Sequence, residues 1–295
     1  MSSNKNAMSI AGTVVGSLVW GLVWYPFRVL EEAGVSGAQA TLVAYLLAML
    51  FGVFLLPRVW RELPRAGWWG ILLVLSIGWT NLGYVLAILH GEVMRVLLLF
   101  YLAPLWTVLL SYWVLDERLN RYGYLIILLS FLGAVIMLWE PSLGLPLPQN
   151  FAEWIGMSAG LAFAFSNVVS RRANHMSVEA KSYGVWFGTV LLTAPLLWMQ
   201  GGLPGQLAES GPQAWLILGL LGIVMCGTGF AVQYAVSYLP ANRAITLFMF
   251  ELVVAAVSSY FLAGESMTLR EWTGALLIVS ASLLSGKLHA GARAA

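Results

Sequence analysis

Charged side chains are scarce in this sequence, and their scarcity decides the class of protein. Only 28 of the 295 residues are Asp, Glu, Lys or Arg, which is 9%, against about 25% in an ordinary soluble domain. The apolar fraction is 60%, and the mean hydropathy is +0.83. So few charges cannot cover a soluble protein of this size, and so apolar a chain does not stay disordered. The net charge of +2, without a dense Lys/Arg cluster, also excludes a nucleic-acid-binding protein.

Cysteine and histidine are nearly missing, and most catalytic and metal-binding motifs are missing with them. The single Cys226 excludes a disulfide framework and a CxxC metal site. His90, His175 and His289 are scattered over loops and segment ends, and neither an HExxH motif nor a Walker A loop is present. We therefore expect no enzymatic activity, no catalytic residues, no metal site and no cofactor.

Long polar stretches are also absent, whereas apolar stretches that can cross a membrane recur along the chain. A helix needs about 20 apolar residues to span the hydrocarbon core. Ten segments of this kind are predicted, at residues 9–29, 37–57, 67–89, 93–114, 121–139, 152–171, 181–199, 213–236, 241–262 and 271–288. The first segment does not resemble a cleaved signal peptide, because it is too long and Lys5 alone precedes it. The sequence therefore predicts an all-α membrane protein with ten transmembrane helices.

The distribution of Lys and Arg predicts the orientation of these helices. If the N-terminus is cytoplasmic, 12 of the 15 basic residues fall in cytoplasmic loops and tails, and only Arg28, Arg95 and Arg270 lie outside. The positive-inside rule applies best to short loops such as these. We therefore expect both termini in the cytoplasm, which requires an even number of spans.

The two halves of the chain resemble each other. At an offset of 148 residues, Phe100 aligns with Phe248 and Glu117 with Glu265; at an offset of 144, Gly12-xxx-Gly16 aligns with Gly156-xxx-Gly160. These matches predict two five-helix repeats, residues 1–145 and 146–295. Because five is odd, the second repeat would be inverted in the membrane, around a central cavity, as in many secondary transporters.

Several short motifs carry a resemblance to a known family. They are Trp20-Gly21, Ala87-Ile-Leu-His90, Pro104, Asp116-Glu117, Tyr234-Ala-Val-Ser-Tyr-Leu-Pro240, Gly264-Glu265 and Gly274. With them the chain resembles, over nearly its whole length, the EamA-type branch of the drug/metabolite transporter superfamily, and within it the YddG-like amino-acid exporters. The resemblance implies a ten-span exporter of the bacterial cytoplasmic (inner) membrane, with a central cavity lined by spans 1, 3, 4, 6, 8 and 9. The second half departs from the first in having Glu251 and Leu252 where the first has Ala103 and Pro104.

Glu251 is the acidic residue that lies well inside a predicted span, near the membrane midplane. A charge at this depth costs about 2.5–3.5 kcal/mol on insertion scales, so it needs a reason. One interpretation is a cavity carboxylate that binds the α-ammonium group of an amino acid or carries a proton. The alternative is a structural carboxylate that is protonated, or paired with Tyr or Asn across a helix interface.

Three amides are the next polar candidates in the predicted spans. Gln233, Asn81 and Asn167 can bind the carboxylate and ammonium groups of a zwitterion without placing a fixed charge in lipid. The alternative for each is a hydrogen bond between helices, which is worth about 0.6–2 kcal/mol. Gln233 is the stronger candidate, because it is bulky and surrounded by small residues.

Aromatic residues at depth form the remaining candidate set. Its members are Trp20, Trp24, Trp79, Tyr84, Tyr101, Trp106 and Phe250, of which Trp20 and Trp24 are four residues apart on one helix face. A cavity lined by these rings would suit side chains that stack or bury apolar area. The alternative for any single ring is packing or contact with lipid.

These observations predict a secondary transporter that exports amino acids, with aromatic and other neutral ones favoured, by alternating access. A multidrug or other small-metabolite exporter of the same superfamily is the alternative. A carrier of phosphorylated sugars should place Lys or Arg at cavity depth, and every Lys is predicted to lie in a tail or loop. The expected partners are a small-molecule substrate and the lipid bilayer, with no nucleic acid, no obligatory protein partner and a monomeric chain.

Overall fold

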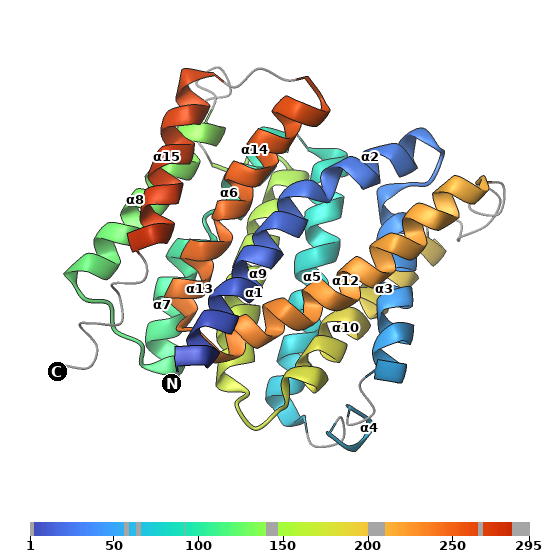
Figure 1. The fold of residues 1–295 in the computed structure, drawn as a ribbon, viewed down its shortest axis with the longest axis horizontal. Coiled ribbons are helices and arrows are strands. Elements are labelled where there is room, and N and C mark those ends of the chain that lie inside the picture. Colours follow the sequence, from blue (N-terminus) through green and yellow to red (C-terminus); the bar gives the residue numbers. More distant parts are fainter. Residues whose placement is uncertain are drawn as a thin grey trace.

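The computed structural model describes residues 3–55, 59–62, 66–91, 93–139, 147–199, 210–264 and 268–284. All regular secondary structure in these residues is α-helical, and the helices pack side by side into one bundle (Figure 1). Residues 56–57 at the end of the second predicted segment, Glu265, residues 285–288 at the end of the tenth segment and His289 fall outside the described residues.

The first half of the chain contributes eight helices among the described residues. They are α1 (Ser3–Leu22), α2 (Trp24–Glu32), α3 (Gly37–Leu55), the short α4 (Val59–Glu62), α5 (Gly67–His90), α6 (Val93–Phe100), α7 (Ala103–Leu115) and α8 (Arg121–Leu138). The second half contributes α9 (Phe151–Arg172), α10 (Val178–Met199), α12 (Pro212–Tyr238), α13 (Ala241–Phe248), α14 (Phe250–Leu262) and α15 (Leu269–Leu284).

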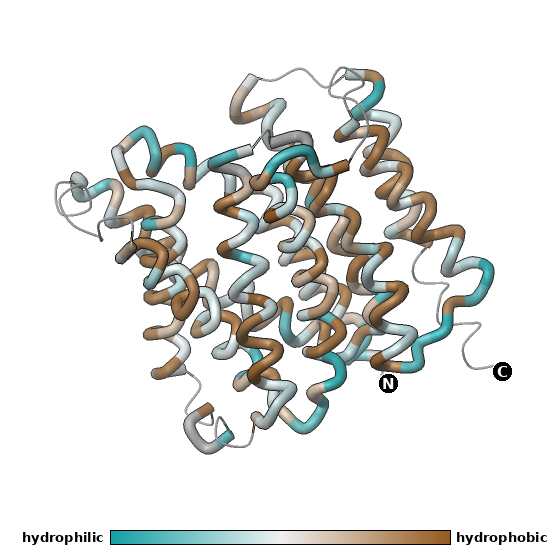
Figure 2. Tube along the Cα trace, turned by 180° about the vertical axis from the view of Figure 1, so that it is seen from behind, coloured by the Kyte–Doolittle hydropathy of each residue, from teal (hydrophilic) through white to brown (hydrophobic). Residues whose placement is uncertain are grey.

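Seven helical segments of the described chain are long and apolar enough to cross a membrane. They are Asn4–Glu32, Gly67–Ala87, Val96–Leu115, Arg121–Leu138, Val178–Met199, Pro212–Tyr238 and Ala241–Leu262, with Gly37–Val53 as a shorter apolar helix. Large apolar side chains face outward on these helices, and the polar residues lie mostly toward the two ends of the bundle (Figure 2). A surface of this kind is stable against lipid and not against water, so the chain is a multi-pass membrane protein.

Three predicted spans are interrupted, and two of the interruptions follow from proline. Proline has no N–H group, and its ring clashes with the carbonyl four residues earlier. Accordingly α1 ends at Leu22, four residues before Pro26, and α6 ends at Phe100, four residues before Pro104. The break that follows α6 thus lies next to Pro104. By contrast, α10 continues through Pro195 without a break.

The third interruption has no proline beside it. The span predicted at residues 241–262 divides at Met249 into α13 and α14, although Leu252 stands where the first half has Pro104. The breaks after α6 and α13 thus start at Tyr101 and Met249, which are related by the same offset of 148 residues as the sequence repeat.

Glycine allows α1 and α9 to approach their neighbours closely. A Cβ atom at Gly160 of α9 would lie 2.3 Å from the carbonyl oxygen of Phe100, and one at Gly12 of α1 would lie 2.5 Å from that of Ala231. The GxxxG pairs therefore serve as helix-packing surfaces. The helix α1 packs against α12, α13 and α14, whereas α9 packs against α5, α6 and α7.

Candidate functional site

Glu251 and Tyr101 meet where the interrupted fourth and ninth predicted spans, residues 93–114 and 241–262, face each other. Tyr101 follows α6 directly, and Glu251 lies in the first turn of α14. The Tyr101 hydroxyl donates a short hydrogen bond to Glu251 Oε1. Tyr101 is buried, whereas Glu251 stays partly exposed. A tyrosine is one of the two partners that the structural interpretation of Glu251 named.

A row of aromatic rings continues from this pair through the middle of the bundle. Phe100 lies edge-on to Tyr84 at 5.2 Å and to Tyr101 at 5.5 Å between ring centroids, and it stacks on Phe163 at 5.7 Å. Phe163 in turn lies 5.8 Å from Phe248. We call Tyr84, Phe100, Tyr101, Phe163, Phe248 and Glu251 the central cluster.

Six predicted spans contribute to the walls of the central cluster. Its members come from α5, from the interrupted fourth and ninth predicted spans, and from α9. Gly16 of α1 and Val232 of α12 lie against Phe248. These are spans 1, 3, 4, 6, 8 and 9 of the predicted order. A few polar groups among apolar walls, contributed by several helices, are typical of small-molecule sites.

Trp79 and Asn81 face other neighbours than the central cluster. Trp79 Nε1 donates to Ser158 Oγ at 3.1 Å, and Asn81 Nδ2 donates to Thr189 Oγ1 of α10 at 2.7 Å. Trp79 also lines a groove of about 430 Å³ with side chains of α5, α7 and α9: Leu72, Leu75, Ser76, Leu110, Ser158, Leu161, Ala162 and Phe165. Both residues thus form hydrogen bonds between helices, as expected if their role is in helix packing.

The aromatic residues of α1 and α2 contact α14 and a separate apolar cluster. Trp20 and Trp24 lie on either side of Val23, where α1 gives way to α2. Trp24 Nε1 donates to Ser258 Oγ of α14 at 2.9 Å, and Trp20 packs on the apolar cluster around Trp186. Phe250, next to Glu251 in the chain, is partly buried.

Gln233 belongs to a buried polar group near the end of α12. Ser170 Oγ donates to Gln233 Oε1 at 2.7 Å, and Lys181 Nζ donates to the Ser170 carbonyl at 2.6 Å and to Ser237 Oγ at 3.0 Å. Lys181 is only 2% exposed and lies inside α10, so the expectation that every Lys lies in a tail or loop is wrong. The helix begins at Val178, three residues earlier than the predicted span, and this shift takes Lys181 into the bundle.

Asn167 lies on the inner face of α9, one turn beyond Phe163. It is 4% exposed, and within the described chain its Nδ2 has no hydrogen-bond partner, as is also true of Trp106 Nε1. Phe163, Asn167 and Arg171 are spaced four residues apart, so they follow one face of α9 from the central cluster toward its C-terminal end.

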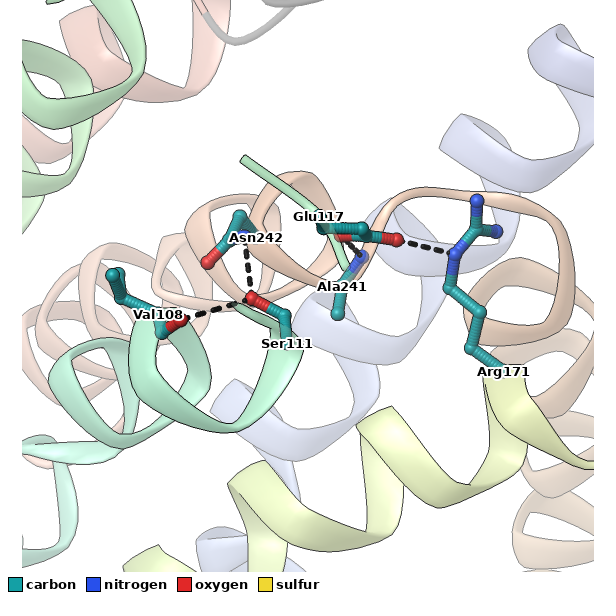
Figure 3. A network of polar contacts seen from close by, with 6 residues as sticks. All are labelled: Val108, Ser111, Glu117, Arg171, Ala241 and Asn242. Carbon is teal, nitrogen blue, oxygen red and sulfur yellow. Dashed lines mark hydrogen bonds and ion pairs between the residues drawn. The ribbon is translucent and has the colours of Figure 1, made fainter. Parts of the chain in front are cut away.

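A second polar network lies at the C-terminal end of α9 (Figure 3). Arg171 Nε lies 2.6 Å from Glu117 Oε1, and Glu117 Oε2 accepts the Ala241 N–H group at 3.0 Å. Asn242 Nδ2 donates to Ser111 Oγ at 2.8 Å. The network joins α7 of the first half to α9 and α13 of the second. Arg243 beside it is 5% exposed and donates to Asn6 Oδ1 at 3.0 Å, so it does not extend to the surface.

Several of these residues were missed by sequence reasoning. Phe100 and Phe248 had a signal, because they align at the repeat offset, but they were not proposed as site residues. Phe163 is three residues after Gly160 and therefore shares its inward face, which is a signal that can be read only once the packing of α9 is known. Nothing in the local sequence shows that Lys181 is buried.

One sequence pattern resembles a catalytic motif and is not one. Gly156-Met-Ser-Ala-Gly160 has the GxSxG spacing of a hydrolase nucleophile, which requires a sharp turn between strand and helix. Here the five residues lie inside α9, and Ser158 Oγ donates to the Ile155 carbonyl and accepts from Trp79. The serine is part of helix packing.

Comparison with known proteins identifies the family. The EamA-like transporter family matches residues 7–139 and again residues 150–286. An uncharacterized transporter of Archaeoglobus fulgidus is 28% identical over 83% of this chain and 86% of its own, and the uncharacterized transporter YoaV of Bacillus subtilis is 23% identical over 90% and 92%. The protein RarD of Salmonella typhimurium is 21% identical over 81% and 82%.

A solved crystal structure shares the fold, with a TM-score of 0.76 over 94% of this chain and 98% of its own at 15% identity. The two family matches divide the chain as the sequence repeat does and together cover nearly all of it. The chain therefore belongs to the EamA-like transporter family of the drug/metabolite transporter superfamily, and it is a membrane transporter and not an enzyme.

Proposed function

We propose that this transporter exports amino acids across the bacterial cytoplasmic membrane by alternating access, with the central cluster as its binding site. The observation that carries the proposal is the contact between Tyr101 and Glu251 at the two helix interruptions, beside the row of aromatic rings. Interrupted helices near the midplane are where secondary transporters bind their substrates.

The chemistry of the cluster suits a neutral amino acid with an apolar side chain. The carboxylate of Glu251 offers an acceptor for an α-ammonium group, and the Tyr101 hydroxyl orients that carboxylate. The rings of Tyr84, Phe100 and Phe163 offer faces and edges on which an aromatic or aliphatic side chain can pack.

We further propose ten spans in two inverted five-helix repeats, in a monomer with both termini in the cytoplasm. Two pairs of contacts support this symmetry. Gly12 of α1 packs against Ala231 as Gly156 of α9 packs against Ala87, at a common offset of 144 residues. The first helix of each half thus packs on the third span of the other, as expected of two equivalent, interlocked repeats.

Counterflow in proteoliposomes tests the cargo. Vesicles loaded with unlabelled amino acids are supplied with labelled threonine, methionine, phenylalanine or tryptophan, and a cationic dye and a phosphorylated sugar serve as controls. Saturable exchange of the amino acids alone is the expected result. Transport of the dye alone would instead assign the protein to multidrug export.

Glu251→Gln tests the site in the same assay. The amide preserves the shape of the side chain and removes the charge that would bind the ammonium group. We expect at least a tenfold loss of exchange. A tenfold loss corresponds to about 1.4 kcal/mol of lost binding free energy. Glu271→Gln, in the first turn of α15, is the matched control and should exchange normally. Normal exchange by Glu251→Gln would remove Glu251 from the site.

A further inference from the structure

The turn after α7 directs Glu117 back onto the bundle. Asp116 has a left-handed backbone with φ of 52°, and the N–H groups of Asp116 and Glu117 both donate to the Ser111 carbonyl. This arrangement ends α7 and reverses the chain. As a result, Glu117 points toward Arg171 of α9 and the start of α13 (Figure 3).

Each carboxylate oxygen of Glu117 has its own donor. Oε1 pairs with Arg171 Nε at 2.6 Å, and Oε2 accepts the Ala241 N–H group at 3.0 Å. Ala241 is the first residue of α13, whose preceding residue Pro240 forms no side-chain cap and whose first turn contains no acidic residue. Glu117 therefore supplies, from the other half of the chain, the acceptor that the start of α13 lacks.

The two donors together have the properties of a carboxylate receptor. A guanidinium group forms strong, directed hydrogen bonds with carboxylates, and the N-terminus of a helix carries a partial positive charge. Ala241 is 2% exposed, so its N–H group cannot turn to bulk water when the carboxylate leaves. The side chains of Arg171 and Glu117 are 28% and 19% exposed, so a small ligand can reach them.

The receptor lies on the inner face of α9 that begins at the central cluster. Phe163 belongs to that cluster, Asn167 follows it by one turn with an unpartnered Nδ2 in the described chain, and Arg171 follows by another turn. Arg171 thus lies two helical turns from Phe163 on the same face of α9.

From this geometry we infer that Arg171 and the Ala241 N–H group form a second carboxylate-binding site, which Glu117 occupies in this structure and a ligand carboxylate occupies when Glu117 moves away. Glu117 is a tethered competitor whose contacts hold α7, α9 and α13 together. The cargo's carboxylate would take its place during transport; this role rests on the proposed function, whereas the site itself does not.

Chemical rescue tests the site without a transport assay. In Glu117→Ala the receptor is vacated, and we expect the midpoint of thermal unfolding in detergent to fall by about 5 °C. Sodium formate should restore most of this loss, whereas sodium chloride at equal ionic strength should not. Formate should have little effect on the parent protein, in which Glu117 occupies the site.

Three further variants make the test specific. Arg171→Gln added to Glu117→Ala should abolish the formate effect, because the cationic donor is lost. Asp116→Asn removes a neighbouring carboxylate whose side chain is 81% exposed. Asparagine tolerates the left-handed backbone, so this variant should unfold like the parent. If Glu117→Ala does not fold, Glu117→Ser replaces it, since the short side chain also leaves the site vacant, and formate should stabilise that variant in the same selective way.

Equal effects of formate and chloride on the Glu117 variants, or rescue that persists without Arg171, would overturn the second site. That result would leave amino-acid counterflow unaffected. Selective rescue combined with no amino-acid exchange would keep the site and discard the proposed cargo, so the two proposals fail separately.

Discussion

At the scale of single residues, the buried Lys181 is the least expected feature of this protein. Its ammonium group is enclosed, and its hydrogen bonds go to the Ser170 carbonyl and to Ser237 Oγ. Ser170 lies in the last turn of α9, where carbonyl groups have no partner within the helix and the helix dipole is negative. Lys181 therefore caps α9 from α10, which explains how a charge is tolerated there.

Replacing Lys181 tests this capping role. Lys181→Met keeps the length of the side chain and leaves the Ser170 carbonyl buried without its charged donor, so we expect a loss of about 2 kcal/mol in the free energy of unfolding. Ser237→Ala, which removes one neutral acceptor, should cost about 1 kcal/mol. Unfolding followed by circular dichroism in mixed micelles measures both. A Lys181→Met variant as stable as the parent would contradict the capping role.

At the scale of helices, α9 is the element that brings the site together. Gly156 and Gly160 have no side chain, so α5 and α6 can pack closely against α9. This close packing places Phe163 against Phe100. The same face continues to Arg171, so one helix connects the central cluster with the second carboxylate site. The polar residues Asn167 and Arg171 lie on the same inward face of α9 as Phe163.

A pair of glycine substitutions tests the close approach of α9. In Gly160→Ala the new methyl group would meet the Phe100 backbone, so the helices must separate, and we expect a loss of about 1–3 kcal/mol. Gly219→Ala on α12 meets no atom within 4 Å and should be neutral or stabilise by up to about 1 kcal/mol through helix propensity. The comparison uses the same unfolding assay, and equal stabilities for the two variants would refute the packing argument.

At the scale of the whole molecule, the proposed arrangement of ten spans makes neighbouring loops lie on opposite sides of the membrane. Glu32 ends α2, with its side chain 69% exposed, and Asn174 follows α9 on the surface. Between them lie the spans from α3 to α9, which number five, so the two positions should face different compartments.

Cysteine labelling tests that topology. In a Cys226→Ala background, Glu32→Cys should react with a membrane-impermeant maleimide in intact cells, and Asn174→Cys should react only after the membrane is permeabilised. The reason is the excess of Lys and Arg on the Asn174 side, which stays in the cytoplasm. Reaction of both cysteines in intact cells would contradict the proposed number of spans, and reversed labelling would contradict the orientation.

Sequence reasoning succeeded where the signal was periodic or compositional. Each of the ten predicted segments overlaps one described helix or two consecutive ones, and seven helical segments of the described chain are long and apolar enough to cross a membrane. The duplication and the family were also found this way, as the two family matches confirm. It failed for Lys181, because a segment boundary uncertain by three residues is enough to move a side chain between a loop and the interior.

Hydropathy and repeated residues are properties of the chain alone, and they are enough to predict a helical membrane transporter with two related halves. The tertiary structure decided which polar groups meet. Tyr101 and Glu251 are 150 residues apart, and Glu117 and Ala241 are 124 apart. No local rule relates residues at such distances; the packing of α9 and the break at Met249 bring them together.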